Sequence, residues 1–418
     1  MSGTAALGID VGTSGVRAAI LEPGEHVVAT SAASMNDYGA NSRDPKVWLS
    51  TLTAALEALF QKVSATEIGA IAIDGTSGTV LGLDIHGQPV GDGLMYNDAV
   101  KDPKIPAAIA SVAPRDSAAH GASSALARSI ALQDRPGVVR IVHQADWIAE
   151  QIAGTAVPTD ESNALKTGYD PVARRWPSWL EKTPLRQDLL AEVVPAGQQT
   201  GSASGRFGLP KGAALIAGAT DGCASFLATG ASEPGDAVTA LGTTLTVKLL
   251  SDSPIFAPEF GIYSHRIGNR WLAGGASNTG GGVLAEYFEP DEIIRLSAKI
   301  DPNVETGLDY YPLTAPGERF PVNDPALAPR LEPRPDDDAT FLQGIFEGIA
   351  RIEALGYNRL VSLGAPKQTS IRTVGGGARN TVWQGIRLRH LGLSPADVVS
   401  NDAAVGVARL ALTHLDQS

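Results

Sequence analysis

The sequence predicts an α/β protein built from two similar halves. Three β-prone runs near the start precede an amphipathic segment and a fourth apolar run, an order that favours a mixed sheet with helices on its faces. A strand, a small polar turn and a return strand occupy residues 7–20 and occur again at 237–250. This repetition suggests two domains, each with a phosphate-binding turn. The length of 418 residues fits, since a domain averages roughly 150 residues.

The first pair of strands surrounds a turn of glycine, serine and threonine. Asp10 ends the first strand, and Gly12, Thr13 and Ser14 follow it. Consecutive N–H groups in such a turn bind anions, and the hydroxyls add donors. A carboxylate beside them suits Mg²⁺, which is usually held by one or two carboxylates together with phosphate and water. A hairpin with a solvated aspartate explains this segment alone equally well.

The rest of the first half alternates strands and helices. We expect a third strand at 27–33, and Asp44 followed by Pro45 is a typical start of a helix. The run 68–74 reads as a buried strand that ends in Asp74-Gly75-Thr76-Ser77-Gly78-Thr79. The hydroxyls of Thr76 and Ser77 can both donate and accept hydrogen bonds, which suits a polyol ligand. We further expect a helix at 145–154 and a strand at 213–217.

Asp221 follows that last strand and precedes a run of small residues. Its carboxylate could accept a proton from a substrate hydroxyl. It could equally cap a helix that begins at Gly222. Spacing alone slightly favours the cap, and the two roles are compatible.

The second half begins near residues 232–235 and repeats the pattern of the first. Gly242, Thr243 and Thr244 form its polar turn, and a long irregular loop is expected over the seven prolines of 311–335. A strand at 371–374 runs into three consecutive glycines, which allow a nucleotide to approach the backbone before the next helix. We expect helices at 341–355, 380–392 and 402–415. Neither the Walker P-loop nor the dinucleotide glycine pattern occurs.

Composition narrows the function further. Hydrophobic residues make up 43% of the chain and charged residues 19%, as in globular proteins with a substantial core. The net charge of -12, without a cluster of Lys or Arg, argues against nucleic-acid or anionic-membrane partners. The single cysteine, Cys223, excludes a disulfide framework and is expected to be a buried packing residue. The start has no signal-peptide pattern and no run of about 20 apolar residues occurs, so we expect a cytoplasmic protein.

Taken together, the motifs resemble those of the FGGY carbohydrate kinases, within the actin-like ATPase superfamily. Their order and spacing match from end to end, although each is weak alone. The chain departs from the family pattern at Tyr96, where Trp is common, and at Lys101, a displaced basic residue. The matching stretches are 8–14, 95–98, 145–148, 159–164, 189–195, 218–221, 233–237, 241–244, 316–319 and 375–380.

The resemblance implies two actin-like (ribonuclease H-like) domains, each a mixed five-stranded sheet flanked by helices, with an interdomain cleft. It implies a sugar-binding domain at 1–231 with the catalytic base, and a nucleotide-binding domain at 232–418. ATP and Mg²⁺ are the implied cofactors, and the protein is expected to be a monomer or homodimer. Asp221 matches the catalytic base. Asp10 matches a second catalytic carboxylate, which organises Mg²⁺ and the phosphates. The implied nucleotide contacts are Gly12, Thr13, Ser14, Gly242, Thr243, Thr244, Gly375, Gly376, Gly377 and Asn380.

The implied substrate is a small sugar. Asn97 and Asp98 match sugar-contacting positions, and we expect further contacts from Asp10, Thr76, Ser77 and Asp221. The compact chain and the 74–79 block resemble kinases of D-ribulose that are related to xylulokinase. We therefore expect D-ribulose first and D-xylulose second. The alternatives are glycerol or another polyol or ketose, or an actin-like ATP-binding sensor without sugar chemistry.

Overall fold

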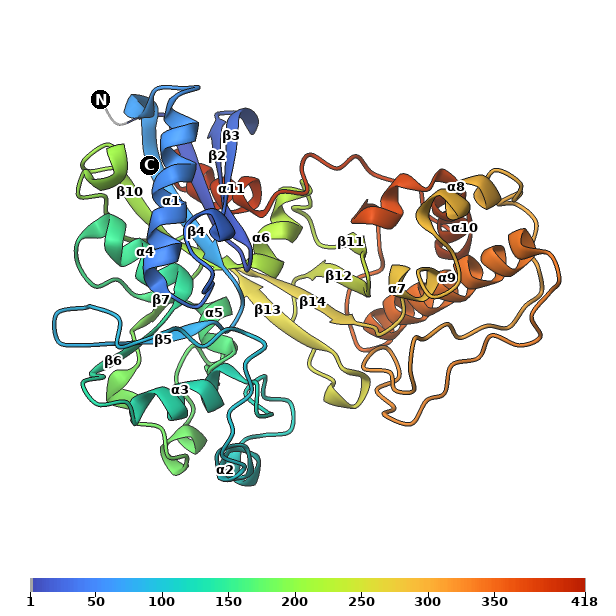
Figure 1. Ribbon diagram of the computed structural model, residues 1–418, viewed down its shortest axis with the longest axis horizontal. Coiled ribbons are helices and arrows are strands. Elements are labelled where there is room, and N and C mark those ends of the chain that lie inside the picture. Colours follow the sequence, from blue (N-terminus) through green and yellow to red (C-terminus); the bar gives the residue numbers. More distant parts are fainter. Residues whose placement is uncertain (1–2, 418) are drawn as a thin grey trace. The chain divides into compact units, whose positions relative to one another are not determined.

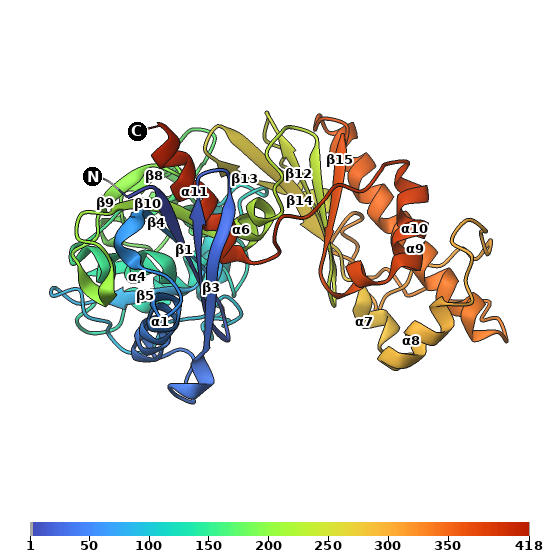
Figure 2. The same cartoon turned by 90° about the horizontal axis from the view of Figure 1, so that it is seen from above.

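The computed structural model describes residues 3–417, which form two compact units (Figures 1 and 2). The first unit contains the chain up to Ala228 together with 265–268 and the segment from Asp402 onward. The second contains 229–264 and 269–401. The predicted division fell at 231/232, close to the first break. It differs in placing residues 402–418 in the second half.

A six-stranded mixed sheet forms the centre of the first unit. Strands β1, β2 and β3 form an antiparallel meander, as expected, and β4 and β10 lie parallel to β1 on its other side. The sheet has one strand more than expected, because the short β9 pairs antiparallel with β10 at the edge. The strands, in their order across the sheet, are β3 (His26–Ser34), β2 (Gly15–Glu22), β1 (Ala5–Val11), β4 (Ile68–Gly75), β10 (Ala214–Thr220) and β9 (Gln199–Ser202).

Side-chain alternation along β1 gives this sheet two different faces. Leu7, Ile9 and Val11 pack into the cluster that holds helices α1 (Pro45–Phe60) and α4 (Gln144–Ala153). Asp44 caps α1 by accepting the N–H of Lys46, as predicted, and Gly154 ends α4 in a left-handed conformation. The opposite face packs small residues against α6 (Asp221–Ala228) and α11 (Ala403–Gln417).

Helix α11 lies among the N-terminal strands although it comes last in the chain (Figure 1). The approach is close because both partners are small. A Cβ atom on Gly8 would lie 1.9 Å from the carbonyl oxygen of Ala404, and one on Gly406 would lie 1.8 Å from that of Ala224. This glycine-mediated contact is why residues 402–418 belong to the first unit.

Smaller elements complete the first unit. The region 94–132, which sequence periodicity leaves unassigned, contains two helices that pack together, α2 and α3. Cys223 is buried, as expected. The bounds are β5 (Val80–Leu83), α2 (Lys104–Val112), α3 (Ala125–Gln133), β6 (Arg140–His143), β7 (Thr159–Asp160), α5 (Glu161–Leu165) and β8 (Val193–Val194).

A five-stranded mixed sheet forms the centre of the second unit, although residues 265–267 of its strand β13 group with the first unit. Its strands, in order, are β13 (Tyr263–Ile267), β14 (Arg270–Ala276), β12 (Leu245–Ser251), β11 (Asp236–Leu241) and β15 (Ser370–Val374). The helices are α7 (Gly281–Leu284), α8 (Pro290–Ser297), α9 (Asp338–Ser362) and α10 (Thr381–Leu391). Within 298–337 the structure has no helix or strand, in agreement with the expected proline-rich loop.

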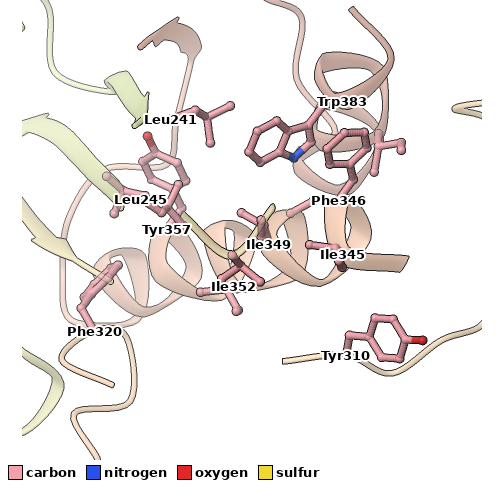
Figure 3. Packing of buried hydrophobic residues seen from close by; sticks show 14 of the residues in the cluster. Leu241, Leu245, Tyr310, Phe320, Ile345, Phe346, Ile349, Ile352, Tyr357 and Trp383 are labelled. Atoms are coloured by element: carbon pink, nitrogen blue, oxygen red, sulfur yellow. The ribbon is translucent and has the colours of Figure 1, made fainter. Parts of the chain in front are cut away.

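Helix α9 forms the centre of the second core (Figure 3). It presents Ile345, Ile349 and Ile352 to the apolar cluster, at helical spacing. Phe346 stacks on Trp383 of α10, with ring centroids 4.9 Å apart. This stacking connects the core of α9 to the first turn of α10. No helix of residues 3–417 is long and apolar enough to cross a membrane.

A fully buried ion pair joins α9 to α10. Arg387 donates from Nε to Glu353 Oε2 at 2.6 Å and from Nη2 to Oε1 at 2.5 Å. Thr239 of β11 donates to the same carboxylate, and both charged side chains have no exposed surface. A buried pair with every partner in place is costly to break, because the remaining charge is left without compensation.

We predict that Arg387→Met destabilises the second unit by about 3–5 kcal/mol, because Glu353 then keeps a buried charge without its cation. Chemical denaturation followed by circular dichroism measures the change. Arg295→Met is the matched control: it removes an exposed 3.3 Å pair with Glu292 and should cost less than about 1 kcal/mol. Equal effects of the two substitutions would contradict the prediction.

Candidate active site

Three strands of the first unit end side by side at one edge of the sheet. Asp10 of β1 and Asp74 of β4 are direct neighbours in the parallel register, and Thr220 of β10 pairs with Gly75. Alternation places both aspartates on the face that α6 and α11 cover, since Ala6 and Ala72 lie there two or four residues earlier. Asp221 follows Thr220 directly and begins α6. The carboxyl ends of parallel strands are the usual ligand edge of an α/β sheet.

Asp74 is the most deeply buried of these acids. It has no exposed surface, and neither of its carboxylate oxygens accepts a hydrogen bond from an N–H or hydroxyl group of the described chain. Burial raises the pKa of Asp74 well above its usual range, and the neighbouring Asp10, Asp221 and Asp402 raise it further. The pKa of Asp74 is raised well above its usual range and that of Asp10 is raised less, so Asp74 is the acid of this pair that favours the protonated form.

Asp10 is also buried, but it keeps a cationic partner. Arg17 of the neighbouring strand donates to its Oδ2 at 3.1 Å, and the side chains of Arg17 and Asp10 are 51% and 5% exposed. Burial raises the pKa of Asp10 above its usual range, and the hydrogen bond with Asp74 and the charge of Arg17 offset only part of that rise.

The turn after Asp10 has free hydroxyls at its tip. Gly12 donates its N–H to the carbonyl of Gly15 at 3.0 Å, while Thr13 and Ser14 are exposed. Carboxylate oxygens are the ligands that Mg²⁺ prefers, so Asp10 fits the predicted metal site. Among the residues described, no group of three or more acidic, His or Cys side chains could hold a metal alone. Such an ion would take its other ligands from phosphate and water.

Asp221 occupies the first turn of α6. Its carboxylate accepts the N–H of the adjacent residue, Gly222, at 2.7 Å, whereas a capping aspartate accepts the N–H two or three residues further on. The preceding residue, Thr220, donates its N–H to Ser162 Oγ at 3.0 Å. Ser162 in turn donates to Asp160, whose carboxylate also caps α5. A buried hydrogen-bond chain thus fixes the backbone that carries Asp221.

The two hydroxyls predicted to bind sugar differ in their surroundings. Thr76 is 4% exposed, and its Oγ1 bonds with Thr79 Oγ1 at 2.6 Å and Gln144 Oε1 at 2.8 Å. Ser77 has a buried Oγ without a hydrogen-bond partner in the described chain. Thr76 therefore has the features of a structural hydroxyl, and Ser77 is the stronger candidate for a ligand contact.

Asn97 and Asp98 occupy a loop next to this block. Asn97 is exposed, whereas Asp98 forms a bidentate ion pair with Arg43, at 3.0 Å to Nε and 2.6 Å to Nη2. Asp98 also accepts the N–H of Met95 at 2.8 Å, and the hydrogen bond from Arg43 lowers its pKa. Asp98 is therefore ionised and held in place, with part of its side chain still open to solvent.

The second unit repeats the turn of the first. Gly242 donates its N–H to the carbonyl of Thr244 at 3.2 Å, and Thr243 and Thr244 are exposed. A second glycine run, 280–282, packs on this turn: Gly281 N–H donates to the carbonyl of Gly242 at 2.8 Å and Gly282 N–H to that of Thr243 at 2.9 Å. The two runs together form a compact polar loop at the end of β11.

A cavity of about 910 Å³ lies next to this loop, within the second unit. Its volume is within the range of small-molecule sites. The walls are mainly apolar and come from α7, α8 and the start of α10. Lining residues include Gly242, Thr243, Gly376, Gly377, Asn380, Ile293, Ile294, Ser297 and Trp383.

The glycines and Asn380 shape this cavity. Gly375 has a φ of 88°, and a Cβ on Gly377 would lie 2.6 Å from the Trp383 ring, so larger residues would not fit. Asn380 caps α10 by accepting the N–H of Trp383 and donates to Ser297 of α8 at 2.8 Å. Asn380 therefore connects the two walls of the cavity.

Several residues of these sites were missed by sequence reasoning. Arg17, Arg43 and the apolar walls from α8 give no motif, since their partners lie far away in sequence or across strands. The glycine run 280–282 follows a strand as the three recognised glycine turns do, and that pattern could have identified it.

Family models match both units of the chain. The N-terminal domain of the FGGY family of carbohydrate kinases matches residues 5–101, and its C-terminal domain matches residues 237–415. The chain is 26% identical over 411 residues to the xylulose kinase of Streptomyces coelicolor, covering 91% of this chain and 82% of that protein.

Solved structures of sugar kinases share the fold. The xylulose kinase of Bifidobacterium adolescentis superimposes with a TM-score of 0.79 at 20% identity, covering 99% of this chain and 93% of that one. Plasmodium falciparum glycerol kinase with ADP gives a TM-score of 0.82 at 15% identity, covering 99% and 90%. These matches confirm the two-domain α/β fold, and the chain belongs to the FGGY family of carbohydrate kinases, phosphotransferases with an alcohol group as acceptor.

Proposed function

We propose that this enzyme transfers the γ-phosphate of ATP to the terminal hydroxyl of a ketopentose, D-ribulose before D-xylulose. The observation that carries the proposal is the group of Asp10, Asp74 and Asp221 at one sheet edge of the first unit. A carboxylate that accepts a proton lies there beside a second carboxylate suited to a metal ion. An ATP-binding sensor would need Asp10 and the glycine turns, but not Asp221 or the Asn97–Asp98 loop.

In this proposal Asp221 accepts the proton of the sugar hydroxyl. The alkoxide oxygen forms a bond to the γ-phosphorus as the bond to the β-phosphate oxygen breaks, and ADP leaves. Bound Mg²⁺ supplies charge neutralisation on the phosphoryl oxygens, and Asp10 would hold it.

In this proposal the second unit binds the nucleotide and the first unit binds the sugar. The cavity between α7, α8 and α10 is mainly apolar, as an adenosine site requires, with the turn of Gly242 and Thr243 beside it for phosphate. The first unit supplies hydroxyl, amide and carboxylate groups for the sugar, of which Ser77, Asn97 and Asp98 are the main candidates. The ketopentose class is supported by the xylulose kinases among the relatives, and D-ribulose by the resemblance of the 74–79 block.

A substrate panel tests the proposal: kcat/KM for D-ribulose, D-xylulose, L-ribulose, D-fructose and glycerol, with ADP release and sugar phosphate both measured. We expect D-ribulose to be preferred, because a site that hydrogen-bonds a given hydroxyl can discriminate by up to about 10⁴–10⁵. A preference for glycerol or a hexulose would reject the pentulose assignment. ATP binding without any sugar phosphate would favour the sensor.

Asp221→Asn should lower kcat by about 10²–10⁴-fold, since it keeps the size of the side chain but removes the proton acceptor. The KM values for sugar and ATP should change little. Steady-state kinetics measure both, and Asp116→Asn, which removes an exposed carboxyl group, is the control. Turnover at the wild-type rate would mean that Asp221 serves only the helix start.

Asp10→Ala should abolish turnover, because the metal and the phosphates lose their carboxylate. Sugar binding, measured by calorimetry without nucleotide, should survive in part. Thr13→Val is the milder companion variant, since its backbone N–H remains available to phosphate. If Asp10→Ala turns over with an unchanged dependence on Mg²⁺ concentration, the metal assignment is wrong.

The buried Asp74 predicts a specific pH dependence of stability. A raised pKa means that the folded state holds the proton more tightly than the unfolded state, whose value is near 3.8. The stabilisation is therefore complete below that pH and is lost as the pH rises toward the raised pKa. Asp74→Asn keeps a donor toward Asp10 and cannot ionise, so it should avoid this loss.

Urea denaturation of the two proteins from pH 4 upward, without Mg²⁺, measures the effect. The free energy of unfolding of the wild type should fall with pH relative to Asp74→Asn. The Asp116→Asn variant corrects for the removal of one carboxyl group at the surface. Parallel curves for wild type and Asp74→Asn would show that Asp74 ionises normally.

A further inference from the structure

Arg128 is a buried guanidinium in α3 to which no function has been assigned. It is 2% exposed, and in the described chain no carboxylate forms an ion pair with it. Burial lowers the pKa of Arg128 to about 10, while the charge of Asp98 opposes the shift. A buried cation is costly unless its donors are used. The contacts of Arg128 therefore need an explanation.

The guanidinium donates to four backbone carbonyls. Nη1 reaches Tyr96 at 2.9 Å, Asp98 at 3.2 Å and Ser123 at 2.5 Å, and Nη2 reaches Gly78 at 2.6 Å. These carbonyls belong to three separate segments of the first unit. Two of them, 76–79 and 95–98, carry Ser77, Asn97 and Asp98, the candidate sugar contacts.

A second arginine holds the same loop from its other side. Arg43 binds the carboxylate of Asp98, whereas Arg128 binds its carbonyl. The 95–98 loop is also joined to the 76–79 block directly, because Tyr96 N–H donates to Thr79 Oγ1 at 3.2 Å. Backbone carbonyls accept hydrogen bonds but cannot bond to one another. The rigid guanidinium of Arg128 supplies the donors that connect the carbonyls of the two loops.

Gly78 provides the space that Arg128 occupies. It has a φ of 81°, and a Cβ there would lie 2.9 Å from Nη2 of Arg128. A side chain at this position would push on the guanidinium as well as strain the backbone. The missing side chain at Gly78 thus leaves the space that the guanidinium of Arg128, 50 residues later, occupies.

We propose that Arg128 is a positioning residue that fixes the loops 76–79 and 95–98 and so sets the affinity for the sugar. This inference rests on the proposed function, because it takes those loops as the sugar site. Arg128 does not touch the reacting atoms, and the nucleotide cavity lies in the other unit. Its loss should therefore change the KM for sugar and leave the KM for ATP.

Arg128→Lys keeps the charge but cannot donate to four carbonyls at once. We expect the KM for sugar to rise about tenfold or more, the scale of a lost hydrogen bond to a charged group. The KM for ATP and kcat at saturating sugar should stay within about twofold. Arg135→Lys is the matched control, since Arg135 also donates to two carbonyls, Val90 and Asp92, in a loop without candidate sugar contacts.

A second variant keeps the test open if Arg128→Lys folds poorly. Gly78→Ala leaves the arginine in place but displaces its guanidinium, and should also raise the KM for sugar. Gly87→Ala controls for backbone strain, because Gly87 has a φ of 74° and no atom within 4 Å of its added Cβ. Hydrogen–deuterium exchange should show faster exchange in the two loops for Arg128→Lys and Gly78→Ala only.

The outcomes separate this inference from the proposed function. Unchanged KM for sugar in folded variants would overturn the role of Arg128, as would equal rises in the KM for sugar and ATP. If the wild type phosphorylates no sugar of the panel, the proposed function fails. The exchange measurement then still decides whether Arg128 holds the two loops, and unchanged exchange would overturn that as well.

Discussion

Two carboxyl groups on neighbouring parallel strands, away from water, dominate the first unit. Asp10 and Asp74 are in register, so their side chains leave the sheet on the same face. Repulsion prevents both from being ionised there, and Arg17 lies on the side of Asp10. Of the two, Asp74 therefore favours the protonated form, and Asp10 is the one that has a cationic partner.

The main feature of the second unit is its mainly apolar cavity. Trp383 lines this cavity and is held in place by its stacking on Phe346. Glycines at 375 and 377 allow the backbone to lie close to that wall. The buried Arg387–Glu353 pair connects the helices behind the cavity.

Local sequence patterns predicted most of the helices and strands and the glycine-rich turns of both units. Asp44, Gly154 and Asn380 act at helix ends as their residue types indicate, and Asp10 in β1 and Asp221 after β10 were identified as candidate chemical groups. What local patterns cannot show is partnership across the chain. The hydrogen bonds of Thr76 to Gln144 and of Arg128 to three loops depend on tertiary packing. The same limit explains why the packing of the last helix against the first sheet was not predicted, since only its small residues facing Gly8 indicate its neighbour.

The placement of α11 also has a consequence for the order in which the protein folds. The face of the first sheet that carries Asp10 and Asp74 is covered by a helix about 400 residues away in sequence. Contacts between such distant residues form slowly, because a long chain must close before they stabilise anything. The face that carries Asp10 and Asp74 is therefore fully covered only after the second unit has been translated.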